Sequence, residues 1–253
     1  MFFAKAGKYE ACKLFSPGHF TLIIITFMCI VVALKKTIHK SKQEVHKIIK
    51  ILTIIIVGLE VVKICFKLQD FKIINVKEWV PLYYCSLVLY AGILSSFATG
   101  KLKRVGDVFL ATGSIVGGLV FIILPTTSLP TYPAFHFISI HSFFLHGTMV
   151  YLTLLINLTN YIELEKKDGV YFAGLVLIAC VAALIVNIKF NSNLMFISKN
   201  FPNTPIELIY NVTGILFTPI MIIAQMFLPF YGVYGILKLF KKMKGKKEEK
   251  NEF

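Results

Sequence analysis

Long apolar segments recur along the whole chain, and they constrain its fold more than any other feature. A helix needs about 20 residues to cross the hydrocarbon core of a membrane, and 57% of the 253 residues are hydrophobic. Soluble domains are closer to 45–50% apolar. The predicted spans cover residues 18–34, 48–66, 79–98, 105–124, 136–158, 170–189 and 208–239. We therefore predict an all-α polytopic membrane bundle of seven transmembrane helices.

Basic residues predict the orientation of this bundle. The loops 35–50, 99–104 and 160–168, together with the stretch from Lys238 onward, carry 18 Lys and Arg residues, against 8 on the opposite side. Because cytoplasmic loops are enriched in these residues, we predict the N-terminus outside and the C-terminus inside. We expect a single transmembrane domain over residues 1–240 in the cell membrane. Residues 241–253 are predicted to be a charged, disordered cytoplasmic tail.

The net charge of +14 does not indicate nucleic-acid binding. The lysines lie in short loops and in the tail, and Arg104 is the only arginine. This distribution favours contact with anionic lipid at the cytoplasmic face, besides the membrane phospholipids around the spans. The five cysteines lack C-x-x-C spacing, so they indicate neither a disulfide framework nor a zinc ribbon. We expect no metal and no cofactor.

Polar residues inside the predicted spans converge on one level, in the outer half of the membrane. At 1.5 Å per residue, Glu60 lies ~10 Å and Cys85 ~9 Å from the outer face. His141 and His146 lie in the outer half of the fifth span, and Asn187 is near the outer end of the sixth. Polar residues within a membrane are costly and are candidates for function. The sequence therefore predicts a polar cavity that opens outward.

Several of these residues have both a structural and a functional interpretation. Glu60 is either a site residue or the partner of Lys63 at i+3. Cys85 is either a small core residue or a nucleophile. His146 is either a buried hydrogen-bond partner or a proton carrier. His141 and His146 are five residues apart, about 140° around a helix, so they do not offer a helical zinc pair.

Small residues line one face of the fourth predicted span. The pattern Gly113-x-x-x-Gly117, with Gly118 next to it, predicts close helix packing. Asp107, at the inner end of this span, is interpreted as a solvated or capping carboxylate. The chain has no G-x-S-x-G elbow, no P-loop and no G-x-G-x-x-G. The signatures of the commonest enzyme classes are therefore absent.

Three motifs, in order along the chain, resemble those of a known family. They are Pro-Leu-Tyr-Tyr-Cys-Ser-Leu at residues 81–87, Phe-His-Phe at 135–137 followed by His-Ser-Phe-Phe-Leu-His-Gly at 141–147, and Asn-Leu-Met-Phe at 193–196 followed by Pro-Asn-Thr-Pro at 202–205. This pattern resembles the YwaF-like bacterial membrane proteins, which are related to the eukaryotic transmembrane protein 164 family. The resemblance covers nearly the whole chain.

The resemblance implies a membrane acyltransferase that moves a fatty-acyl chain between phospholipids, using a cysteine and a histidine. The chain departs from the family pattern in two places. Many relatives have histidine where Tyr83 stands, and the animal form has its cysteine where Leu82 stands. Cys85 lies three residues after Leu82, close to one helical turn, so it can face the same cavity.

The leading hypothesis is therefore a lipid acyltransferase or hydrolase. Cys85 would be the nucleophile and His146 its general base, with Glu60 or His141 orienting the histidine. Substrate would enter sideways from the lipid, through a gap between spans. The expected substrate-binding residues, some of them hydrogen-bond donors to the oxyanion, are Tyr83, Tyr84, Asn187 and Asn193.

Two other functions are compatible with the same residues. In a small-solute or proton-coupled transporter, Glu60 and His146 would handle protons, and Pro219 and Pro229 would kink the seventh span. In a non-catalytic scaffold, the polar residues would only hydrogen-bond between helices.

Overall fold

The computed structural model describes residues 1–70 and 79–251, and this part of the chain is helical with no strand. The longer helices are α1 (Pro17–Thr37), α2 (Lys42–Asp70), α4 (Leu87–Phe97), α5 (Gly100–Ala111), α6 (Gly113–Ile123), α7 (Phe137–Leu158), α8 (Gly169–Phe190), α9 (Pro205–Thr213) and α10 (Phe217–Asn251). Short 3-10 turns are η1 (Tyr84–Ser86), η2 (Lys166–Asp168), η3 (Leu194–Phe196) and η4 (Gly214–Leu216). The predicted all-α class is confirmed for these residues.

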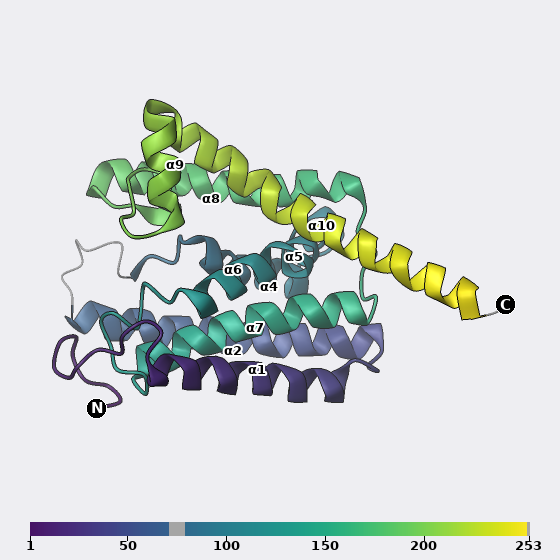
Figure 1. Cartoon of the computed structure of the whole chain (residues 1–253), viewed down its shortest axis with the longest axis horizontal. Helices are drawn as coiled ribbons and strands as arrows, with labels where there is room; N and C mark the ends of the chain where they lie inside the picture. The colour runs from purple at the N-terminus through teal and green to yellow at the C-terminus, as the bar shows by residue number, and fades with distance from the viewer. Residues whose placement is uncertain (71–78, 252–253) are drawn as a thin grey trace.

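The long helices run lengthwise through the molecule, with the chain termini at opposite ends (Figure 1). Helices α1, α2 and α7 form one side, and α8 and α10 form the other, with α4, α5 and α6 between them. Helix α7 contacts α1, α2, α5 and α6. This central position explains why most of its side chains are buried.

Five segments of the described chain are long and apolar enough to cross a membrane: Pro17–Thr37, Gly100–Ile123, Phe137–Leu158, Lys166–Phe190 and Pro205–Met243. A shorter apolar helix covers Tyr84–Phe97. Helix α2 is 29 residues long but carries several charged residues along its length. The protein is thus a multi-pass helical membrane protein, and length and composition alone support five of the seven predicted spans.

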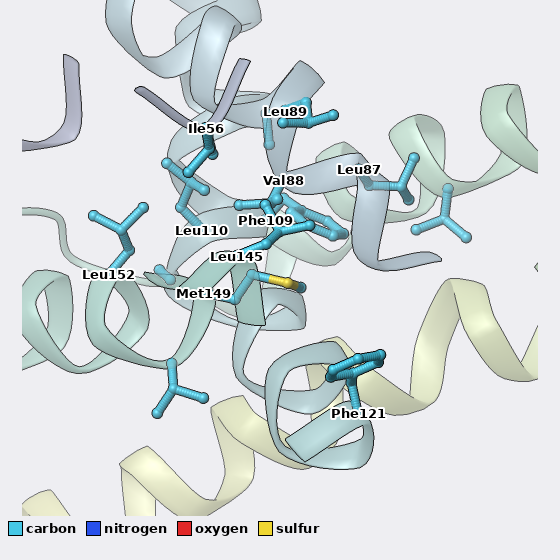
Figure 2. Packing of buried hydrophobic residues seen from close by; sticks show 14 of the residues in the cluster. Ile56, Leu87, Val88, Leu89, Phe109, Leu110, Phe121, Leu145, Met149 and Leu152 are labelled. Carbon is cyan, nitrogen blue, oxygen red and sulfur yellow. The ribbon is translucent and has the colours of Figure 1, made fainter. Parts of the chain in front are cut away.

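Apolar side chains occupy both the interior and the outer surface of the bundle. In the interior, residues such as Phe109 and Met149 pack between helices (Figure 2). On the outside, large apolar side chains of α8 to α10 are exposed, and Ile215 reaches 96% exposure. Large exposed apolar surfaces are rare on soluble monomers. Such a surface is the one expected to contact lipid.

The structure interrupts the helix in the regions of the third and fourth predicted spans. The third predicted span begins at residue 79, but residues 80–82 are not helical, and η1 and α4 begin only at Tyr84 and Leu87. The fourth span is broken at Thr112, whose φ is −133° and ψ is −75°. The Thr112 hydroxyl donates to the carbonyl of Val108 at 2.6 Å. Threonine side chains that bond to backbone carbonyls in this way often bend helices.

The seventh predicted span is broken at Gly214 and not at Pro219. Gly214 has a φ of +52°, a conformation that glycine adopts without steric cost, and it ends α9. Pro219 lies in the first turn of α10, where proline is tolerated, and Pro229 is inside the helix. Helix α10 continues to Asn251, into the stretch for which the sequence predicts a disordered tail.

The small-residue face of α6 packs closely, as predicted. A Cβ atom at Gly113 would lie 2.5 Å from the ring of Phe172, and one at Gly118 would lie 2.8 Å from the backbone oxygen of His146. A Cβ at Gly117 would also be too close to its neighbours, at 2.9 Å. These glycines allow α6 to approach α7 and α8 closely.

Two ion pairs with buried carboxylates lie at α5: one joins α5 to η2, and the other is within α5. Arg104 donates to Asp168 from Nε at 2.9 Å and also from its terminal nitrogen. Asp107 is buried and accepts from Ser95 at 2.5 Å and from Lys103 at 2.7 Å. The interpretation of Asp107 as a solvated or capping carboxylate is therefore wrong, because its charge is balanced by Lys103 inside the fold.

Candidate functional site

A cavity of about 740 Å³ lies between α6, α7, α10 and the turns η1 and η3. Its wall includes Tyr83, Tyr84, Cys85, His141 and His146, all of which the sequence singles out. Much of the remaining wall is apolar and comes from α6 and from α9 and α10. A mostly apolar pocket with a few convergent polar groups is typical of small-molecule sites.

Cys85 reaches the cavity through a turn at the start of the third span. Tyr83 is extended, with φ −91° and ψ 159°, and η1 follows it. The backbone N–H of Ser86 donates to the carbonyl of Tyr83 at 2.9 Å and closes this turn. Cys85 is half-buried on the cavity wall. Tyr84 packs against the glycine face of α6, where its hydroxyl donates to the carbonyl of Gly113 at 3.4 Å.

His146 lines this cavity, and one of its two ring nitrogens bonds to the backbone. Its Nδ1 lies 2.6 Å from the backbone carbonyl oxygen of Ser142. A carbonyl only accepts hydrogen bonds, so Nδ1 carries the proton and Nε2 of the neutral ring carries a lone pair. Nε2 is buried and has no hydrogen-bond partner among the described residues. The ring stacks on Phe121, with 3.7 Å between centroids and 10° between planes. The ring of His146 is therefore fixed in place, with Nε2 left without a partner in the described part of the chain.

Two other histidines, His19 and His136, have no ring nitrogen without a hydrogen-bond partner. In His19 and in His136, Nδ1 accepts from a backbone N–H and Nε2 donates to a backbone carbonyl, at 2.9 to 3.1 Å. Both rings are fully used in holding the fold. By contrast, neither ring nitrogen of His141 has a hydrogen-bond partner among the described residues. Spare hydrogen-bonding capacity thus separates His141 and His146 from the structural histidines.

Glu60 joins α2 to α7 behind the cavity. Its Oε1 accepts from Lys63 at 2.6 Å, so the predicted i+3 pair is formed. Its Oε2 lies 3.5 Å from Nε2 of His141. Glu60 is 4% exposed, and the ion pair with Lys63 offsets part of the cost of burying its carboxylate. Its Oε2 has no hydrogen-bond partner among the described residues. The contact between Glu60 and His141 brings together two residues that the sequence places at one depth.

The group that orients His146 differs from the expectation. The sequence suggested Glu60 or His141 for this role, but the carbonyl of Ser142, one turn earlier in the same helix, makes the bond to Nδ1. Within the described chain, the thiol of Cys85 forms no hydrogen bond to either cavity histidine. Catalytic hydrogen bonds are often long in unliganded enzymes and shorten when substrate binds. Cys85 and His146 therefore share a wall without forming a ready-made ion pair.

Asn187 and Asn193 are outside the wall of this cavity. Asn187 is buried, accepts from Ser192 and from the N–H of Leu194, and donates to the Leu194 carbonyl and to Ser198, at 2.7 to 3.0 Å. Asn193 accepts from two backbone N–H groups and donates to one carbonyl in the same loop. These two expected substrate-binding residues thus have their side chains committed to the loop after α8.

This loop shapes the cavity through two strained residues. Met195 has a φ of 57° and Phe196 a φ of 54°, in the left-handed region that residues with side chains rarely adopt. Both line the cavity. The motif Asn-Leu-Met-Phe therefore combines an asparagine that fixes the turn with two apolar side chains that form the wall.

Gln225 is a cavity residue that we did not anticipate from the sequence. It donates from Nε2 to the carbonyl of Met195 at 2.9 Å. Its Oε1 is buried with no partner among the described residues. A usable signal was present, because Gln225 is the only amide in the apolar stretch 219–230.

The cavity opens on the side of the bundle that is expected to contact lipid. Val120 of α6 and Leu228 of α10 both line it, and they are 59% and 70% exposed. A wall residue with so much exposed surface marks the mouth of the cavity. By the same measure Thr127 and Thr131, in the connection between α6 and α7, also mark an opening. The cavity therefore opens both between α6 and α10 and beside this connection. The described residues contain no group of three or more His, Cys, Asp and Glu side chains that could hold a metal ion.

Comparison with known proteins gives one match. The model of the TMEM164 family matches residues 14–231, a range that includes every residue of the cavity wall. No curated protein and no solved structure matches the chain.

Proposed function

The chain belongs to the TMEM164 family, and we propose that it is a lipid acyltransferase or hydrolase whose site is the cavity at Cys85 and His146. One observation carries this proposal. A buried imidazole with an unpartnered Nε2 and a cysteine thiol share a cavity that opens in part on the apolar outer surface, at Val120 and Leu228. A phospholipid can reach such a site from the bilayer without leaving it.

The first step of the proposed reaction transfers the acyl chain to the protein. Cys85 Sγ attacks the ester carbonyl carbon of a phospholipid while Nε2 of His146 takes the thiol proton. The bond between this carbon and the glycerol oxygen then breaks. His146 returns the proton to that oxygen, so a lysophospholipid leaves and a thioester remains on Cys85.

The second step releases the acyl chain. The hydroxyl of another lysophospholipid attacks the thioester carbon, and its proton passes to His146. The carbon–sulfur bond breaks, and the proton returns to the Cys85 sulfur. A new phospholipid and the original thiol are formed. If water attacks instead, the product is a free fatty acid, and the protein acts as a hydrolase.

The other polar residues have supporting roles in this proposal. Tyr83 and Tyr84 border Cys85 and contact the bound lipid. Glu60 and His141, with 3.5 Å between Oε2 and Nε2, determine the electrostatic environment beside the site. Asn187, together with Asn193, acts at a distance by fixing the turn that carries Met195 and Phe196.

We further propose that α2 and the segment from η1 through α4 complete a seven-span bundle in the cell membrane, with the N-terminus outside and the C-terminus inside. The charges of α2 at Glu60 and Lys63 face one another and α7, so the helix buries them within the protein. In this orientation the cavity lies in the outer half of the membrane. The lysine-rich loops then meet anionic lipid at the inner face.

Replacing Cys85 with serine tests this proposal. The purified protein is given a phospholipid with a labelled acyl chain and an unlabelled lysophospholipid, and the labelled products are separated. We expect C85S to lose acyl transfer by roughly a hundredfold or more, because loss of a nucleophile removes most of the catalysis that depends on it. The matched control is C29S, since Cys29 is exposed on α1. Equal rates for C85S and the native protein would remove Cys85 as the nucleophile.

A further inference from the structure

We propose that Lys63 and Lys67 form a phosphate subsite in the cavity, which binds the head-group phosphate of a phospholipid. This inference rests on the proposed function, because it names the group by which the lipid substrate is held. Lys63 and Lys67 both line the cavity. They are four residues apart on α2, so they lie on one face of the helix.

The two lysines bring positive charge into a mostly apolar enclosure. Lys67 is 6% exposed, and its Nζ lies 5.0 Å from the centroid of the Tyr132 ring. The Lys63 ammonium donates to Glu60, and an ammonium has three N–H donors. Among the described residues no carboxylate lines the cavity itself. Each ammonium group can donate to a phosphate oxygen in addition to its contacts within the protein.

Hydroxyl groups lie beside the same cavity. Thr126, Thr127 and Thr131, in the segment between α6 and α7, are part of its wall. Hydroxyl and ammonium donors together are the usual partners of phosphate oxygens, with lysine acting as a point charge. A phosphate has several acceptor oxygens, so it can use both kinds of donor at once.

The rest of the wall matches the other parts of a phospholipid. The mouth between α6 and α10 is lined by apolar side chains such as Val120 and Leu228, which suit acyl chains. His146 and Cys85 belong to the same wall. With its phosphate at Lys63 and Lys67 and its chains in the mouth, a phospholipid has its ester groups inside the cavity, where the proposed reaction takes place.

Binding of ether lipids tests this subsite without requiring any reaction. The full-length protein in detergent is titrated with a dialkyl ether phosphatidylcholine and with the dialkylglycerol of the same chains, which lacks the phosphate. Ether bonds cannot donate an acyl group, so the result does not depend on Cys85 chemistry. We expect the phosphate-bearing lipid to bind at least about tenfold more tightly, because hydrogen bonds to charged groups are worth that much.

Lysine variants then test whether Lys63 and Lys67 cause the preference for the phosphate-bearing lipid. K67Q and K63Q are each expected to reduce the preference for the phosphate-bearing lipid severalfold, whereas K67R, which keeps the charge, retains it. The matched control is K47Q, because Lys47 is an exposed lysine of the same helix. Thermal unfolding of each variant separates loss of binding from loss of fold.

The source of the phosphate is distinguished in the same experiment. Inorganic phosphate and glycerol phosphate are added as competitors. Weak competition by both, with tight and lysine-dependent binding of the ether phospholipid, supports a head-group site. If inorganic phosphate binds as tightly as the lipid, the cavity is a site for a soluble anion and the lipid assignment is wrong. Equal binding of the two ether lipids, or a preference that survives K67Q and K63Q, overturns the subsite. An inactive C85S protein that still prefers the phospholipid shows that the subsite stands independently of acyl transfer.

Discussion

Replacing His146 with glutamine is expected to slow acyl transfer by about 10²- to 10⁴-fold, the usual contribution of a general acid–base residue. Glutamine can keep a hydrogen bond to the Ser142 carbonyl, which now fixes Nδ1 at 2.6 Å. It cannot take a proton from the Cys85 thiol or return it to the leaving oxygen. The measurement is the rate of transfer of a labelled acyl chain at saturating lipid.

The control for this variant is H39Q, because His39 is exposed in the connection between α1 and α2. Its rate should equal that of the native protein. H146Q should also unfold at nearly the native temperature, so that slow transfer cannot be explained by loss of fold. An H146Q protein that transfers acyl chains at the native rate would exclude His146 as the base.

Replacing Gly106 with alanine is expected to destabilise the protein by about 3 kcal/mol or more, at the upper end of the range for overpacked positions. A Cβ atom at Gly106 would lie 2.4 Å from the carbonyl oxygen of Ala91 and 2.4 Å from the backbone nitrogen of Ser95. Both neighbours belong to the backbone of α4, so no side-chain rotation can relieve the clash. Helices α4 and α5 would have to move apart.

The matched control for Gly106 is Gly174, in the middle of α8. A Cβ at this position would meet no atom within 4 Å. Alanine is the better helix former by roughly 0.5–1 kcal/mol, so G174A should be as stable as the native protein or more so. Thermal unfolding in detergent compares the two variants. Similar unfolding temperatures would mean that α4 and α5 are not packed as closely as the structure indicates.

The sequence predicted the long uninterrupted helices well. The predicted spans 18–34, 136–158 and 170–189 correspond to helices α1, α7 and α8, with ends that agree within a few residues. Each of these segments is a long apolar stretch with polar residues at both ends, so the local sequence is enough to locate the ends of the helix.

The interruptions of the helices could not be predicted in the same way. Apolar composition continues through Thr112 and Gly214, although the helix stops at each. At Thr112 the side chain bonds to the backbone, and at Gly214 the backbone adopts a positive φ. Hydropathy reports neither a hydrogen bond between a side chain and the backbone nor a positive φ. The sequence instead suggested kinks at Pro219 and Pro229. Pro219 lies in the first turn of α10, where proline is tolerated.

For the candidate site, the sequence correctly brought Cys85 together with His141 and His146 in one cavity. It could not tell which histidines have a spare nitrogen, because their partners are backbone groups from other segments. His19, for example, donates to the carbonyl of Ile122, 103 residues away. Asn187 was predicted to bind substrate for a related reason. Its side-chain hydrogen bonds are all to residues of the loop that follows α8, which the sequence does not reveal.

The buried ion pairs show the same limit. Arg104 and Asp168 are 64 residues apart and meet only because α5 and the start of α8 are neighbours. Charge counts placed both residues at the inner side of the bundle without indicating that they are paired. The positive-inside pattern describes the number of charges on each side and not their contacts.

Mass spectrometry of the protein after incubation with phospholipid tests the central claim most directly. The account predicts a thioester-linked acyl group on Cys85 in the native protein, in an experiment without an added lysophospholipid acceptor. The same adduct should be strongly reduced in H146Q, and it should be removed when lysophospholipid is supplied. If the native protein transfers acyl chains while Cys85 remains unmodified, the covalent route is wrong. If it neither transfers acyl chains nor forms an adduct, the cavity is not an acyl-transfer site, and transport through it becomes the stronger explanation.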